Sequence, residues 1–158
     1  MNLISHNLKQ SDYAALAEFR YHIRRFLHFS KQAARRAGIE PQHHQLMLAV
    51  KAAGGAHGAR IADLAERLQV QHHSAVELID RLEERELIRR ARGLDDRREV
   101  YVSLTPQGEH ILQHLTLHHR EELRSAAPAL ITALHQVAGR QRTARPPKPR
   151  VPTRKGRS

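Results

Sequence analysis

The sequence predicts a mainly α-helical fold with a small β wing, in which a winged helix-turn-helix lies between N- and C-terminal dimerisation helices. Over residues 61–82 apolar residues recur every three or four positions, with a break at Gln69 and Val70, and this is typical of two helices joined by a tight turn. Over residues 88–104 the apolar period changes to two, which indicates a β-hairpin. Long helices with single apolar seams are expected on both sides.

The first long helix is expected over residues 11–38. Its apolar positions alternate three and four apart, at Leu16, Phe19, Ile23 and Phe26, and its other faces are rich in arginine. Gly38 supplies a helix-ending residue. Such a narrow seam needs a second helix to cover it.

The predicted DNA-binding lobe spans residues 39–105. Pro41 stands at a first helical position, and three glycines near residue 55 form a loose connection. We expect residues 59–61 to add a short strand to the hairpin, which would make a three-stranded wing. Seven of the residues from Arg81 to Arg98 are basic, so a second helix presented beside a basic hairpin is suited to double-stranded DNA.

After the wing, Thr105 and Pro106 have the order of a helix cap and a first helical residue. We expect Pro128 to break this segment into two closing helices that end near residue 138. The segments 11–38 and 106–138 carry more apolar surface than a lobe of this size can cover. The sequence therefore predicts a homodimer, which would place two recognition helices on a palindromic operator.

The net charge of +11 is unevenly distributed. Residues 139–158 carry eight Lys or Arg, no acidic residue and several prolines, so we predict a disordered basic tail and a body of only about +3. The tail would act either as a solubilising end or as a non-specific phosphate-binding arm. Residues 1–10 show no pattern and are expected to fray.

Several classes of protein are disfavoured by the sequence. There is no cysteine for disulfides, thiolate metal sites or thiol redox chemistry. No apolar run approaches the ~20 residues of a membrane span, and no signal-peptide pattern follows the start, so a cytoplasmic protein with no membrane partner is expected. Ile111 follows His110 where a zinc protease helix needs Glu, and phosphate-loop and nucleophile-elbow motifs are missing. We predict neither an enzyme nor a cofactor.

Three sequence stretches carry a resemblance to a known family. They read LAERLQV, SAVELIDRLEERELIRR and DDRREVYVSLTPQG, and with the order of elements they resemble the MarR family of bacterial transcriptional regulators. The resemblance implies a dimer that occludes promoter DNA and is released by a small-molecule effector bound between the dimerisation helices and the lobe. The effector stays unidentified, and no effector-binding residue is assigned.

The resemblance also assigns roles at the wing tip. Asp96 and Arg98 match a family pair in which the carboxylate orients the arginine toward the minor groove. A planar cation suits the strong negative potential of a narrow minor groove. The alternative is a weak wing-tip salt bridge. Arg97 is expected to contact phosphate.

On the recognition helix we expect the DNA-facing positions to be polar residues of its first turns. Glu77 departs from the basic residue that is frequent in the family. We expect its carboxylate to pair with Arg81 and fix it in place, rather than to accept a hydrogen bond from a cytosine amino group. The recognition-helix candidates are Gln71, His72, His73, Ser74, Val76, Glu77 and Arg81.

Thirteen histidines leave a metal as an open alternative. Histidines four apart can chelate a metal, as in the series His110, His114 and His118 on the helix after the wing, and His43 and His44 on the helix that opens at Pro41 could approach them in a dimer. Zinc-responsive members of the same family use histidines of these two helices. The acidic ligand of those members would fall at Phe26, so we predict no metal site and keep His44, His114 and His119 as candidates only. Two alternatives to the effector-released repressor remain: an architectural, non-specific nucleic-acid-binding protein without ligand, and a zinc-responsive regulator.

Overall fold

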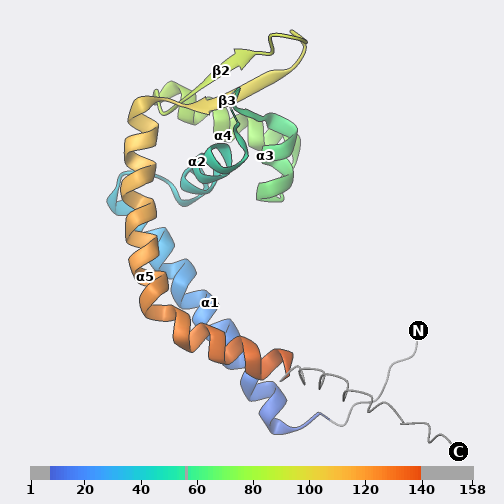
Figure 1. Cartoon of the computed structure of the whole chain (residues 1–158), viewed down its shortest axis with the longest axis vertical. Coiled ribbons are helices and arrows are strands. Elements are labelled where there is room, and N and C mark those ends of the chain that lie inside the picture. The colour runs from blue at the N-terminus through green and yellow to red at the C-terminus, as the bar shows by residue number, and fades with distance from the viewer. Residues whose placement is uncertain (1–7, 56, 140–158) are drawn as a thin grey trace, which may run out of the picture.

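The computed structural model describes residues 8–55 and 57–139, so all but the first residue of the basic tail and most of the N-terminal segment expected to fray lie outside the described residues. Five helices and three strands follow one another in the order α1, α2, β1, α3, α4, β2, β3, α5. A compact lobe built from α2 to β3 lies at one end, and α1 and α5 run side by side away from it (Figure 1). None of the described helices has the length and hydropathy needed to cross a bilayer.

The helix α1 (Gln10–Arg36) begins and ends where local chemistry allows. The backbone N–H of Lys9 donates to the Asp12 carboxylate over 2.8 Å, which fixes the first turn. At the other end Gly38 has φ +72°, a left-handed conformation that glycine adopts without strain. The predicted first helix is confirmed.

The lobe forms as its apolar periodicity predicts. Its helices are α2 (Pro41–Ala53), α3 (Ile61–Leu68) and α4 (His72–Glu84), and its strands are β1 (Ala59–Arg60), β2 (Ile88–Arg92) and β3 (Val100–Leu104). The antiparallel sheet has the order β1-β3-β2, with Ala59 opposite Val102 and Ile88 opposite Leu104. Gln69 takes a left-handed conformation between α3 and α4, where the apolar period breaks. The lobe core consists of Ile39, Leu46, Met47, Val50, Ala59, Leu64, Leu78, Ile79, Leu82, Leu87, Ile88, Val102, Leu104 and Leu112.

The junction between β3 and α5 (Pro106–Ala138) explains the Leu-Thr-Pro-Gln-Gly stretch. The Thr105 hydroxyl accepts the Gly108 N–H over 3.1 Å and donates to the Glu86 carbonyl over 2.7 Å. Gly108 lies so close to the chain that an added Cβ would come within 2.0 Å of the Leu87 carbonyl oxygen. Thr105 therefore caps the helix, while Gly108 lets its first turn pack directly on the end of the lobe.

The expected break at Pro128 is wrong, because α5 continues through it to Ala138 as one helix (Figure 1). Proline removes one backbone donor and crowds the preceding turn, but it does so at one position of a long helix. α5 packs along α1, and this packing supports a continuous helix against the local effect of Pro128. One long closing helix replaces the two expected.

Candidate nucleic-acid interface

The helix α4 has one buried and one exposed face. Ala75, Leu78, Ile79 and Leu82 are buried, which orients the helix on the lobe. Among the predicted contact residues, Gln71, His72, His73, Glu77 and Arg81 are exposed, and Ser74 and Val76 are half-buried. No acidic residue lies in the first turn of α4, so its positive dipole end is left for an external anion.

The expected ion pair between Glu77 and Arg81 does not form. Both side chains are exposed, and within residues 8–55 and 57–139 neither belongs to an ion pair. At the surface such a pair contributes only a few tenths of a kcal/mol, so little stability is lost when it does not form. The acidic residues of α4 that do bind an arginine are Asp80 and Glu83, roughly one and two turns after Glu77.

That arginine is Arg90, on β2. Its guanidinium contacts the carboxylates of Asp80 and Glu83, and its backbone N–H donates to Glu83 over 3.1 Å. Burial alone would lower the pKa of Arg90, but hydrogen bonds to Asp80 and Glu83 raise it above its ordinary value. Arg90 therefore ties the wing to the recognition helix. Sequence reasoning missed this contact, because no local spacing links β2 to α4.

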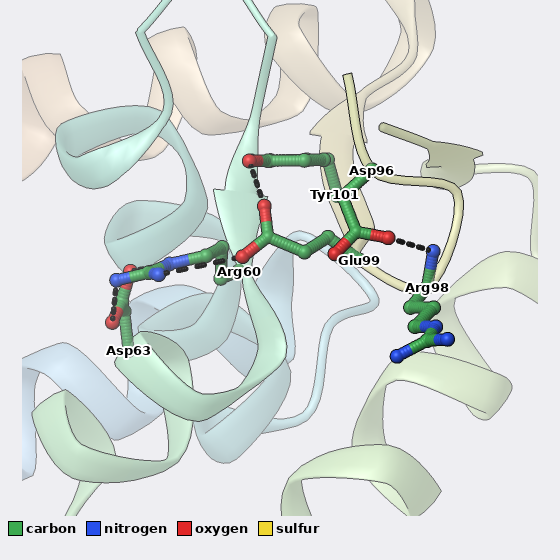
Figure 2. A network of polar contacts seen from close by, with 6 residues as sticks. All are labelled: Arg60, Asp63, Asp96, Arg98, Glu99 and Tyr101. Carbon is green, nitrogen blue, oxygen red and sulfur yellow. Dashed lines mark hydrogen bonds and ion pairs between the residues drawn. The ribbon is translucent and has the colours of Figure 1, made fainter. Parts of the chain in front are cut away.

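The wing tip is a turn closed by its own backbone. The Gly93 N–H donates to the Glu99 carbonyl over 2.9 Å, and the Glu99 N–H donates to the Asp96 carbonyl over 3.1 Å. The Asp96 carboxylate accepts the backbone N–H of Arg98 over 2.8 Å, while the Arg98 side chain extends away from it (Figure 2). Within the described residues no ion pair joins Asp96 to Arg98. The carboxylate thus fixes the Arg98 backbone and leaves the guanidinium free.

A second polar network holds the base of the wing. Arg60 binds the Asp63 carboxylate over 3.0 and 3.2 Å and reaches Glu99 over 3.7 Å, while the Tyr101 hydroxyl donates to Glu99 over 2.5 Å (Figure 2). The hydrogen bond to Asp63 raises the pKa of Arg60. Arg60 is therefore a cation already matched by two carboxylates. Sequence reasoning missed this network as well.

The exposed arginines of the lobe consequently fall into two groups. Arg85 donates to the Gly38 carbonyl over 2.9 Å and Arg89 donates to the Ser103 hydroxyl over 3.2 Å, so both support the fold. By contrast, no protein hydrogen bond from the guanidinium is seen, in the part of the chain that the structure describes, for Arg67, Arg81, Arg92, Arg97 and Arg98. Three of these five belong to the wing. The wing therefore carries most of the free positive charge of the lobe arginines.

The three candidate metal ligands do not meet. The His44 and His119 rings lie 4.8 Å apart, but His114 pairs with His118 instead, with ring centroids 4.4 Å apart. Both ring nitrogens of His119 are engaged, at 2.7 Å from the Leu115 carbonyl oxygen and 2.9 Å from the Ser30 hydroxyl. No three histidine or acidic side chains of residues 8–55 and 57–139 form a group that could hold a metal.

The buried histidines have a different character. Burial, and secondarily the nearby His119, lowers the pKa of His44 to about 4. Its ring packs against that of His119, which also contacts Phe26 and Phe29 edge-on, with ring centroids 6.0 and 5.4 Å away. These side chains come from α1, α2 and α5, so they form an aromatic junction between the lobe and the long helices. A neutral His44 is part of that packing.

Comparison with known proteins shows what the lobe is similar to. Residues 37–99 match the sequence pattern of the MarR family. An uncharacterised HTH-type transcriptional regulator of Bacillus subtilis, YsmB, is 34% identical over 64 residues, which cover 40% of this chain and 44% of YsmB. The chain thus matches less than half the length of this curated relative.

Two solved structures extend the likeness beyond the lobe. AbsC, a MarR family transcriptional regulator from Streptomyces coelicolor, is similar with a TM-score of 0.67 and 22% identity over 82% of this chain and 90% of AbsC. The S. aureus MepR F27L mutant bound to an oligodeoxyribonucleotide is similar with a TM-score of 0.60 and 21% identity over 73% of this chain and 82% of MepR. Residues 37–99 thus match the MarR family model, and the fold of the described chain is similar to that of MarR family transcriptional regulators.

Proposed function

We propose that this protein is a homodimeric, sequence-specific DNA-binding transcriptional regulator, which represses by occluding a palindromic operator and is released by a small-molecule effector. The observation that carries the proposal is the free guanidinium of Arg98, which Asp96 presents through the backbone at the tip of the wing, together with the exposed polar face of α4. In this arrangement α4 enters the major groove and the wing reaches the adjacent minor groove.

Arg97 and Arg98 have different parts in the proposal. Arg98 contacts the minor groove, where a narrow groove attracts a planar cation. Arg97 is exposed next to it and contacts phosphate, which adds affinity without sequence preference. Repression and effector release follow from the family resemblance, and no residue of this chain is assigned to the effector.

The dimer is supported by apolar side chains that the single chain leaves in solvent. On α1 and α5 these exposed residues are Tyr13, Leu16, Tyr21, Leu27, Leu117, Leu123, Ile131, Leu134 and Val137. Apolar surface of this extent on adjacent helices is typical of a subunit interface. A second copy with two-fold symmetry would cover the same patch on both chains and place two α4 helices on one face of the DNA.

The dimer is tested with the double variant Ile131→Asp, Leu134→Asp. Both side chains are about half exposed in the single chain, so the charges leave the chain's own packing intact but oppose a buried interface. Sedimentation equilibrium should show a dimer for the wild type and a monomer for the variant at the same micromolar concentration. An unchanged dimer would reject the assignment of this surface. The matched control is Leu48→Asp, because Leu48 is 46% exposed but lies on α2.

DNA binding is tested by mobility shift with the DNA upstream of the protein's own gene, over a salt series and with competitor DNA. We expect Arg98→Ala to weaken specific binding roughly 5- to 150-fold for each of the two half-sites. Arg97→Ala should weaken binding to all sequences and reduce the salt slope of the dimer by about 2, because one phosphate contact is lost in each subunit. Arg35→Ala is the matched control, because Arg35 is exposed on α1, away from the wing, and forms no ion pair among the described residues.

The same experiment separates the proposal from an architectural binder. A specific regulator keeps its preference for one sequence as salt rises, whereas an architectural binder loses affinity for all sequences together. Wild-type binding without sequence preference, matched by Arg98→Ala, would reject the proposed function.

A further inference from the structure

Leu94, at the wing tip, is the most exposed large apolar residue of the described chain, with 87% of its surface accessible. The other exposed large apolar residues of the described chain are between 38% and 59% accessible, and most of them lie on α1 and α5. Leu94 lies on neither of these helices, so the proposed dimer surface does not account for it.

The turn that carries Leu94 is firmly built. Two backbone hydrogen bonds and the bond from the Arg98 N–H to the Asp96 carboxylate close it. A Cβ added at Gly93 would lie 2.5 Å from the Asp96 carbonyl oxygen, so the turn needs glycine at this position. At its base, Glu99 is held by Arg60 and Tyr101. Leu94 therefore projects from a preorganised support.

The charges around Leu94 indicate what it meets. Arg92, Arg97 and Arg98 surround it in the chain and are exposed without protein hydrogen bonds among the described residues. Cations of this density bring the tip to a phosphate backbone. In the minor groove, apolar side chains such as leucine enter between base steps, unstack them and bend the duplex. Pyrimidine–purine steps resist this least.

We propose that Leu94 is a minor-groove wedge, which the wing inserts beside Arg98 at a pyrimidine–purine step so that the operator bends. This inference rests on the proposed DNA-binding function. Leu94 then selects DNA sequence by how easily a base step deforms, without a hydrogen bond to a base.

The test uses full-length protein and the operator fragment defined by footprinting, with 2-aminopurine placed at the purine of the step nearest the wing. Wild-type protein should raise the 2-aminopurine fluorescence and bend the fragment, measured by energy transfer between its labelled ends. Replacing the step by a purine–purine step should weaken wild-type binding at least roughly fivefold.

Leu94→Ala should still bind the operator but lose the fluorescence rise, the bend and the preference for the step. Leu94→Met, which keeps a long apolar side chain, should retain all three, and Leu48→Ala is the matched control for loss of an exposed leucine elsewhere. A Leu94→Ala variant that matches the wild type in all three readouts would overturn the wedge while leaving the proposed function intact. Absence of any sequence preference in the wild type would overturn both.

Discussion

The lobe buries its apolar side chains, whereas the pair of long helices leaves many of its own exposed. The lobe encloses a core contributed by all of its helices and strands. In α1, by contrast, only Ala33 and Ala34 of 27 residues are buried, and α5 buries four of 33. Nine of the twelve exposed large apolar residues of the described chain lie on these two helices. The difference shows that the lobe is complete within one chain, and the apolar surface left exposed on the helix pair is the surface that the proposed dimer would cover.

The largest expected effect is a difference in unfolding free energy between truncating a buried residue of the lobe and truncating an exposed residue of the helix pair. Ile79→Ala removes a fully buried side chain and should lower the free energy of unfolding by about 2–5 kcal/mol. Ile131→Ala, at 52% exposure, should cost under about 0.5 kcal/mol at the lowest protein concentration and more as dimer forms. Urea unfolding over a range of protein concentrations measures both. Equal costs, independent of concentration, would contradict the comparison.

An intermediate effect is expected where the two regions meet. The folded chain holds the pKa of His44 at about 4, against about 6.5 when unfolded, so the unfolded state binds more protons between these values. Stability is therefore fully present above about pH 6.5 and falls toward pH 4, by on the order of 3 kcal/mol.

His44→Phe keeps an aromatic ring at this junction and should flatten the fall in stability. Urea unfolding at intervals from pH 7 to pH 4.5 compares the two proteins. His43 has a pKa lowered by burial and contributes in the same direction, so some slope should remain in the variant. An identical slope in both proteins would show that His44 is not the group responsible.

The smallest expected effect sharpens the description of α5. Pro128→Ala restores a backbone donor inside a continuous helix and should raise stability by about 1 kcal/mol, below the ~3 kcal/mol that separates the two residues in an ideal helix. Circular dichroism and urea unfolding would measure the gain. A loss of stability would indicate that the chain needs the proline at this position.

Sequence periodicity predicted the fold well, since each element of the lobe has its own local signal. The break between α3 and α4, the cap at Thr105 and the glycine after α1 depend on neighbours in the chain. Pro128 misled for the same reason, because its local effect is outweighed by packing against α1, which is distant in sequence. Local rules fail where distant contacts decide.

The candidate interface shows the same limit. Exposure of Gln71, His72 and His73 follows from the period of α4, and that part of the prediction agrees with the structure. Ion pairs are different, because Arg90 joins residues seven and ten positions away across a strand and a helix, while the expected pair four apart does not form. Which carboxylate reaches which arginine depends on the tertiary placement of both.

The capped junction at Thr105 makes the wing and α5 move together. A single residue separates β3 from α5, and Gly108 touches the backbone of Leu87, so no slack lies between them. In a dimer, the crossing angle of the two α5 helices would therefore set the distance between the two wings. One glycine inserted after Thr105 would make the position of the wing relative to α5 less fixed, without changing any DNA-facing residue.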